Sequence, residues 1–236
     1  MLVRMVVQGL MAVLYALEIT ALLWVTHPNY KEKYYVGVKT LCSISFVGIA
    51  LLFAAISKHW DYFWNLLPAL VLCALGDLFM ALYQVRRKKR QIFLGIFVFL
   101  CAHVSLLVLL FSLDDTFSLW NILFPLAALA VFLILKFKVR LHLGRLLLPA
   151  SIYCVFLSLM LSKCLQYMYL HPAIASGWIG LGGTLFFISD VTIIFLYFYK
   201  FSSKDTGRRV HYMNLVTYYF GILAFDMSIL YLVRIP

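Results

Sequence analysis

The stretch RRKKRQIFLGIFVFLCAHVSLLVLLFS, residues 86–112, decides the fold of this chain. Its first part, residues 86–90, is an unbroken run of Arg and Lys, and its second part is apolar except for Gln91, His103, Ser105 and Ser112. An apolar run of about 20 residues is long enough to cross a bilayer as one α-helix. A basic cluster at one end of such a run is typical of a connection that stays on the cytoplasmic side.

The same pattern recurs along the whole chain. Of its 236 residues, 65% are hydrophobic and only 12% are charged, more apolar surface than the core of a soluble domain this size can bury. The runs are continuous rather than alternating, which argues against a transmembrane barrel. We therefore predict an all-α membrane protein, a bundle of eight transmembrane helices in a single integral membrane domain, residues 1–236. The predicted spans are roughly 4–26, 35–57, 62–84, 91–112, 117–135, 146–166, 177–199 and 211–233.

The basic residues predict the orientation of the bundle. Most of the 20 Lys and Arg residues fall in the first, third, fifth and seventh connections, whereas the opposite side carries only Arg4, Lys58 and Arg234. Since cytoplasmic loops are enriched in Lys and Arg, both termini are expected on the non-cytoplasmic side. The protein is expected in the plasma membrane of a bacterium or the endoplasmic reticulum of a eukaryote.

Ionisable side chains lie inside the predicted spans and are candidates for function. They are Glu18, Lys39, Asp77, Lys163, Asp190 and Asp226. A carboxylate in hydrocarbon costs several kcal/mol unless it finds a partner, a wet cavity or a proton, by the usual order of magnitude. Asp77 and Asp190 lie well inside spans that are nearly free of other charge, so an intramembrane reaction centre or ion site is the leading hypothesis.

The predicted orientation gives these residues a depth. Glu18, Asp77 and Asp190 lie on inward-running spans, on the order of 10–14 Å beneath the cytoplasmic boundary at the helical rise per residue. Lys39 starts the second span and His103 lies near the middle of the fourth. We expect these five side chains to line one cavity that opens toward the cytoplasmic leaflet.

Each of these residues also has a structural interpretation. The two aspartates would then be protonated groups that hydrogen-bond neighbouring helices. Glu18 and Lys39 would form an ion pair or reach toward the interface. His103 would be an interior histidine with satisfied hydrogen bonds, and Lys163, in the outer half, is expected to reach outward.

Four short motifs carry a resemblance to a known family. They are Gly76-Asp77; Gly95, Phe99 and Ala102-His103; Gly183, Phe186 and Ser189-Asp190; and Thr217-Tyr218-Tyr219. In order and spacing the chain resembles the YhhN family, whose characterised members are lysoplasmalogenases. These are eight-span membrane enzymes that hydrolyse the vinyl ether bond of lysoplasmalogens. The chain departs from the family at Leu106 and at Phe220-Gly221-Ile222, which bears on substrate preference.

The resemblance implies a reaction and a set of residues. Asp77 and Asp190 would be the catalytic pair. The supporting residues would be Lys39, His103, Glu18, Ser189, Tyr218 and Tyr219. The expected partners are a lysophospholipid substrate and membrane lipids, with no nucleic acid, and no cofactor or metal is expected.

The chemistry of a vinyl ether suits two carboxyl groups. Protonation of its β-carbon gives an oxocarbenium ion, water adds, and the hemiacetal collapses to an aldehyde and an alcohol. One carboxyl can donate the proton while the other stabilises the cation and activates water, as in glycoside hydrolysis. Asp77 and Asp190 would share these roles, His103 would position water, and Lys39 would hold the lipid phosphate.

Two alternatives come from other classes. A transporter or channel would use Asp77 and Asp190 to bind a proton or cation, because buried carboxylates also mark ion pathways. A metal-dependent lipid hydrolase would use His103 and both aspartates as ligands. The sequence predicts neither headgroup, chain length nor oligomeric state.

Overall fold

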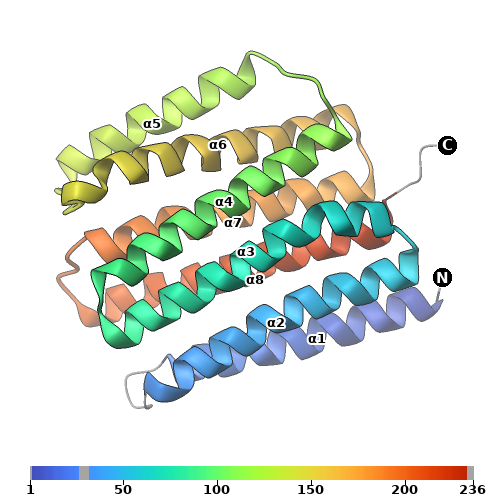
Figure 1. Cartoon of the computed structure of the whole chain (residues 1–236), viewed down its shortest axis with the longest axis horizontal. Helices are drawn as coiled ribbons and strands as arrows, with labels where there is room; N and C mark the ends of the chain where they lie inside the picture. The colour runs from blue at the N-terminus through green and yellow to red at the C-terminus, as the bar shows by residue number, and fades with distance from the viewer. Residues whose placement is uncertain (1, 27–31, 233–236) are drawn as a thin grey trace.

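The computed structural model describes residues 2–26 and 32–232, with side chains for 6–26 and 34–232. The described residues form eight α-helices and one short 3-10 turn, Gly144–Leu146, without a strand (Figure 1). The helices are α1 Leu2–Val25, α2 Glu32–Ser57, α3 Trp60–Arg86, α4 Lys89–Leu113, α5 Trp120–Lys138, α6 Leu147–Leu170, α7 Ile174–Phe198 and α8 Lys204–Tyr231.

All eight helices in the described part of the chain are long and apolar enough to cross a membrane, which confirms the predicted all-α membrane class. The largest difference is at α8, which begins at Lys204 rather than near residue 211. Its first two turns are polar, and the Ser203 hydroxyl accepts a hydrogen bond from the Asp205 amide at the helix start. Hydropathy detects only the part of a helix that lies in hydrocarbon, so it missed this polar extension.

The third, fifth and seventh connections, which are predicted to be cytoplasmic, lie at one end of the bundle (Figure 1, left), and the first connection lies outside the described residues. The exposed basic residues 86–90, Lys138, Arg140 and Lys204 gather there. The side chains of Arg4, Lys31, Lys33 and Arg234, which also entered the charge count, lie outside the described residues. We refer to this end of the bundle as the basic end. Its assignment to the cytoplasm remains a prediction.

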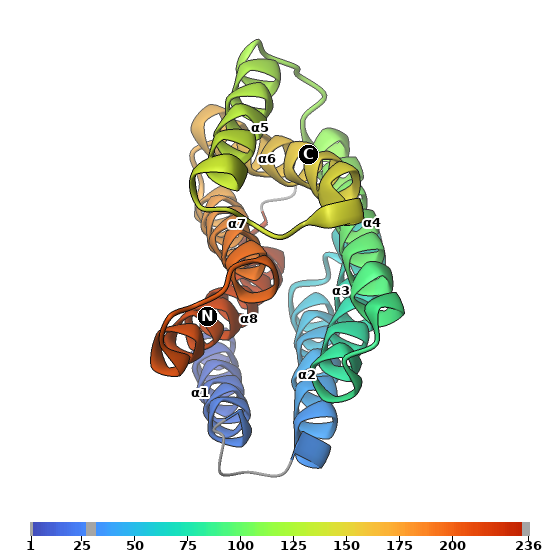
Figure 2. The same ribbon diagram turned by 90° about the vertical axis from the view of Figure 1, so that its left-hand side faces the viewer.

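Seven helices pack in a closed ring, in the order α1, α2, α3, α4, α6, α7 and α8, with α8 returning to α1 and α2. In the end-on view of Figure 2, α5 lies outside this ring beside α6. α8 is the most buried helix and contacts α2 and α3 as well as its ring neighbours. α1 and α5 are the least buried, so their large apolar side chains face lipid.

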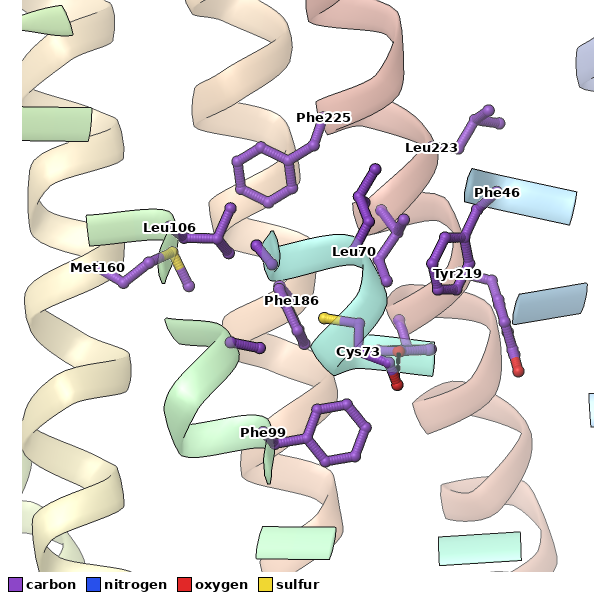
Figure 3. Close-up of a cluster of buried hydrophobic side chains, with 14 of the residues drawn as sticks. Phe46, Leu70, Cys73, Phe99, Leu106, Met160, Phe186, Tyr219, Leu223 and Phe225 are labelled. Atoms are coloured by element: carbon purple, nitrogen blue, oxygen red, sulfur yellow. Dashed lines mark hydrogen bonds between the residues drawn. The ribbon is translucent and has the colours of Figure 1, made fainter. Parts of the chain in front are cut away.

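Glycines allow the central helices to approach closely. A Cβ on Gly182 of α7 would lie 3.0 Å from the carbonyl oxygen of Gly221 on α8, and one on Gly221 would lie 3.0 Å from the Phe186 amide nitrogen. Small residues at such crossings are typical of helix pairs in membranes. Around this contact, side chains from α3, α4, α6, α7 and α8 form one buried apolar cluster (Figure 3).

Lys163 reaches toward the connection at the outer end of the bundle, but it is buried there rather than exposed at the interface. It is fully buried on α6, and its Nζ donates to the carbonyl oxygens of Asp114 at 2.9 Å and Thr116 at 2.7 Å. Its ammonium also lies 4.5 Å from the centre of the Phe111 ring and 3.5 Å from Asp114 Oδ2. Burial raises the pKa of the Asp114 carboxyl, but hydrogen bonds from Thr116 and the charge of Lys163 outweigh it and hold that pKa below its ordinary value. Lys163 therefore fastens the connection between α4 and α5 onto α6.

The α7–α8 crossing predicts a stability difference between two glycines. Gly221→Ala places a methyl group against backbone atoms that cannot move aside, so we expect it to lower the stability of the bundle by about 1–3 kcal/mol. Gly177→Ala, on α7 with open space around its Cβ, should leave stability unchanged or raise it. Thermal unfolding of both variants in detergent measures this, and equal unfolding temperatures would contradict the close crossing.

The orientation can be tested with cysteines, because four of the five native cysteines are buried and the fifth, Cys101, lies within α4. Asp115 and Ser202 are exposed in connections at opposite ends of the bundle. We expect a membrane-impermeant maleimide to label Asp115→Cys in intact cells or sealed vesicles of native orientation, and Ser202→Cys only after permeabilisation. The reverse pattern would invert the predicted topology, and wild-type protein is the control for background labelling.

Candidate active site

Asp77 lies at the centre of a buried polar cluster formed by α2, α3 and α8. Its Oδ1 is 3.0 Å from Nζ of Lys39, and its Oδ2 accepts a hydrogen bond of 2.8 Å from the Ser43 hydroxyl. The Tyr219 hydroxyl makes a longer contact of 3.5 Å with Oδ2. Every contact brings a hydrogen-bond donor to the carboxyl, so both oxygens act as acceptors. The Lys39 ammonium can only donate, so its contact with Oδ1 suits a carboxylate at this position.

The local sequence explains why these side chains meet. Lys39 and Ser43 are four residues apart on α2, so they lie on one face of that helix. On α3, Gly76 precedes Asp77, and a Cβ on Gly76 would come within 2.8 Å of the Phe99 ring. The missing side chain therefore lets α4 pack directly against α3 beside the carboxyl.

Asp190 lies in a second buried cluster, formed by α4, α6 and α7. Its Oδ2 accepts a hydrogen bond of 2.5 Å from the Tyr153 hydroxyl and lies 3.1 Å from Nε2 of His103. The rings of His103 and Tyr153 meet edge to face with centres 5.1 Å apart. His103 is fully buried and Asp190 is 2% exposed, so protein atoms surround this pair.

The hydrogen bonds of His103 restrict where its proton can be. Its Nδ1 lies 2.6 Å from the carbonyl oxygen of Phe99, which can only accept, so Nδ1 carries a hydrogen. The 3.1 Å contact between Nε2 and Asp190 is then favourable only when a second proton is present on either the imidazole or the carboxyl. The imidazole nitrogen and the carboxyl oxygen therefore lie close enough to share one proton.

The Asp190 cluster is not fully satisfied. The Oδ1 atom of Asp190 is buried without a hydrogen-bond partner among the described residues. The contact between His103 Nε2 and Oδ2 has the length of a hydrogen bond but not its alignment, so we treat it as electrostatic. Buried polar groups are normally paired, and catalytic hydrogen bonds often become aligned only when substrate is bound.

Two cavities adjoin the carboxyl clusters. Asp190 and Tyr153 lie in the wall of a cavity of about 270 Å³, whose remaining lining is apolar and comes from α3 to α7 and from Leu141. Lys39 and Asp77 line a much smaller polar cavity of about 10 Å³. Three residues, Met80, Phe99 and Ile193, line both cavities and separate them.

The structure divides the residues expected to share one cavity. Glu18 lies outside both of these cavities, and its Oε1 accepts a hydrogen bond of 2.9 Å from Ser45. The alternative of an ion pair between Glu18 and Lys39 is also wrong, because Lys39 pairs with Asp77. Hydropathy gives depth but not helix order around the ring, and α1 packs against α2 and α8, away from α4 and α7.

The other expected supporting residues lie beside the Asp77 cavity. Ser189 and Tyr218 are in its lining. Ser189 exchanges hydrogen bonds with Asn214 of α8, including one of 2.8 Å to its hydroxyl. The Tyr218 hydroxyl lies 3.4 Å from the Cys73 carbonyl oxygen, and its ring packs edge to face on Phe99 and Phe186.

Sequence reasoning missed Tyr153, Ser43 and Asn214. Ser43 had a signal, since it lies one helical turn after Lys39 on the same face. Tyr153 had none, because aromatic residues are common in membrane spans. Within the described residues no group of three His, Cys, Asp or Glu side chains comes together, so His103 and the two aspartates do not form the ligand set that the metal alternative requires.

Asp226 is a third buried carboxyl and is separate from both clusters. It lies on α8 in the half of the helix away from the basic end, and it is fully buried. Neither of its oxygens has a hydrogen-bond partner in the described part of the chain. It lines neither cavity, as expected for a residue of the outer half.

These features define an integral membrane protein of eight helices, with two buried carboxyl clusters beside an apolar cavity. Comparison with known protein families gives the identity of this class. The chain belongs to the YhhN family, whose profile matches residues 34–229, most of its length. The match begins at α2, so α1 and Glu18 lie outside it. No curated protein and no solved structure matches the chain.

The ion pair of Lys39 and Asp77 predicts a thermodynamic coupling. Lys39→Met leaves a buried carboxylate without its countercharge, and we expect it to destabilise the protein by about 3–5 kcal/mol. In the double variant Lys39→Met/Asp77→Asn the uncompensated charge is gone, so much of this loss should be recovered. Lys200→Met, at an exposed position, should change stability by no more than about 0.5 kcal/mol. Additive effects of the two substitutions would show that the pair is not coupled.

Proposed function

We propose that this protein is a lysoplasmalogenase, which hydrolyses the vinyl ether bond of a lysoplasmalogen to a fatty aldehyde and a glycerophosphodiester of choline or ethanolamine. One observation carries the proposal: a carboxyl group, Asp190, lies in the wall of an apolar cavity beside an imidazole with which it can share a proton. Membership of the YhhN family, whose characterised members have this activity, supports it.

In the first step, the proton of the Asp190–His103 pair is transferred to the substrate. The carboxyl of Asp190 protonates the β-carbon of the vinyl ether, and the electron pair of the double bond forms the new C–H bond. The ether oxygen then shares the positive charge as an oxocarbenium ion. Tyr153 donates a hydrogen bond to Oδ2 and stabilises the carboxylate that remains, and Nε2 of His103 lies 3.1 Å from the same oxygen.

In the second step, Asp77 acts as the base for the attacking water. A cavity of 10–15 Å³ holds about one water molecule, which needs two to four polar partners. The polar cavity beside Asp77 has about this volume and offers Lys39, Asp77 and Asn214 as partners. Asp77 takes a proton as the water oxygen bonds to the cationic carbon. When the hemiacetal collapses, Asp77 returns this proton to the departing ether oxygen, and the hemiacetal hydroxyl gives its proton to Asp190, which releases aldehyde and alcohol. The net reaction consumes one water and leaves both carboxyls in their starting states.

The cavities also orient the substrate. The cavity at Asp190 is apolar and opens between helices in the half of the bundle near the basic end, so it suits the hydrocarbon chain. The reacting carbons would lie at the partition of Met80, Phe99 and Ile193, which borders both cavities. A lipid that enters from the leaflet at the basic end would keep its headgroup outside this partition.

Aldehyde release from lysoplasmalogen by purified protein tests the proposal. We expect Asp190→Asn and Asp77→Asn each to lower turnover by about 10²–10⁴-fold, the usual contribution of a general acid or base. Asp226→Asn is the matched control, because it changes a buried carboxyl of the same bundle outside both clusters, and it should retain activity. Full activity in either Asp77→Asn or Asp190→Asn would contradict the assigned role of that residue.

A further inference from the structure

A third cavity lies at the basic end and has no role in the chemistry described above. Its volume is about 290 Å³, and α1, α3, α7 and α8 contribute to its wall. Figure 2 shows the ends of these helices facing the viewer. The polar and small residues of its wall are Thr26, Gln84, Arg87, Gly207, Arg208 and His211. We refer to this cavity as the vestibule.

The charges in the vestibule wall are positive. Arg87 has no acidic partner within 4.0 Å in the described part of the chain. Arg208 forms one hydrogen bond of 2.7 Å, from Nη2 to Asp205 of its own helix, and a guanidinium has further N–H donors on its other nitrogens. Two guanidinium groups in one cavity are suited to a phosphate, because their planar donors match its oxygens.

The backbone adds to this field. Gly207 belongs to the first turn of α8, so the positive end of that helix dipole lies at the vestibule. The same turn carries Asp205, whose carboxylate already pairs with Arg208. The cavity therefore combines two guanidinium groups with a helix N-terminus at the end of the bundle where lipid phosphates are expected.

The vestibule adjoins the polar cavity at Asp77, because two residues, Tyr197 and His211, line both cavities. Lys39, which the sequence suggested as the phosphate ligand, is already neutralised by Asp77 at 3.0 Å and lies deeper, so a phosphate that bound it would have to disrupt that ion pair. Within the described residues, Arg87 and Arg208 form no ion pair with Asp77 or Asp190.

We propose that the vestibule binds the phosphodiester of a lysophospholipid, with Arg87 and Arg208 as its ligands. The assignment of that lipid as a substrate rests on the proposed function, whereas the binding itself does not require turnover. The headgroup would lie in the vestibule, and the lipid would extend past Tyr197 toward Met80, Phe99 and Ile193, which border the apolar cavity. The site thereby selects phosphorylated over neutral glycerol ethers.

A binding experiment tests the site without catalysis. The probe is a 1-alkyl lysophosphatidylcholine, which lacks the vinyl ether, compared with the 1-alkylglycerol of the same chain, and the readout is affinity for the purified full-length protein by calorimetric titration in detergent. We expect wild type to prefer the phosphorylated lipid, and Arg87→Gln/Arg208→Gln to lose this preference. Each arginine should account for about a tenfold change in affinity, as for a charge-assisted hydrogen bond.

The neighbouring arginines provide a matched control. Arg86→Gln/Arg209→Gln removes the same charge from the same end of the bundle, at exposed residues that do not line the vestibule. This control should keep the preference of wild type. Equal losses in both double variants would reduce the effect to general surface charge and overturn the proposal, as would an unchanged preference in Arg87→Gln/Arg208→Gln.

Soluble probes identify the source of the phosphate. Glycerophosphocholine should compete with the lysolipid, whereas tighter binding of inorganic phosphate than of glycerophosphocholine would make this a free-phosphate site and overturn the lipid assignment. In the aldehyde assay, Arg87→Gln/Arg208→Gln should raise KM for lysoplasmalogen with little change in kcat. If no variant or wild type releases aldehyde, the proposed function fails while the titration still decides whether the vestibule binds the phosphodiester.

Discussion

The packing of the bundle depends on compensating the negative charge of a buried carboxylate, Asp77. Lys39 compensates this charge by forming an ion pair with it. A carboxylate within a helical bundle in a membrane is tolerated only with partners at hydrogen-bond distance. Lys39 and Ser43 from α2 and Tyr219 from α8 provide them, so α2 and α8 are both joined to α3 through one carboxyl. The glycine before Asp77 then lets α4 pack closely, which brings His103 toward the centre.

The two carboxyls differ in what surrounds them, and this difference favours two chemical roles. Asp77 accepts hydrogen bonds at both oxygens and has a cation beside it. Within the described residues, one oxygen of Asp190 has no hydrogen-bond partner, and the other lies against an imidazole whose Nδ1 donates to a carbonyl oxygen. A base next to water and an acid next to an apolar chain are what vinyl ether hydrolysis requires. Environment, rather than residue type, separates such roles in enzymes with paired carboxyls.

The number and approximate extent of the helices could be predicted because a bilayer fixes both length and hydropathy. The basic loops likewise could be predicted to gather at one end. The partners of each ionisable residue could not, because hydropathy carries no information about the order of helices around a ring. Glu18 and Asp77 have similar depth, yet one meets Ser45 and the other Lys39. Lys163 was assigned to the interface because nothing in the sequence indicates that residues 114–116 fold over it.

Polarity varies in one direction through the interior of the bundle. The vestibule at the basic end has arginines in its wall, the small cavity behind it has an ion pair, and the cavity at Asp190 is apolar apart from one carboxyl and one phenol. A molecule that is anionic at one end and aliphatic at the other fits this order in only one orientation. The atoms at the junction of its two parts then lie at Met80, Phe99 and Ile193, between the two carboxyl clusters. In a lysoplasmalogen that junction is the vinyl ether, so under the proposed function this orientation would place the labile bond between the carboxyl proposed as the acid and the carboxyl proposed to activate water.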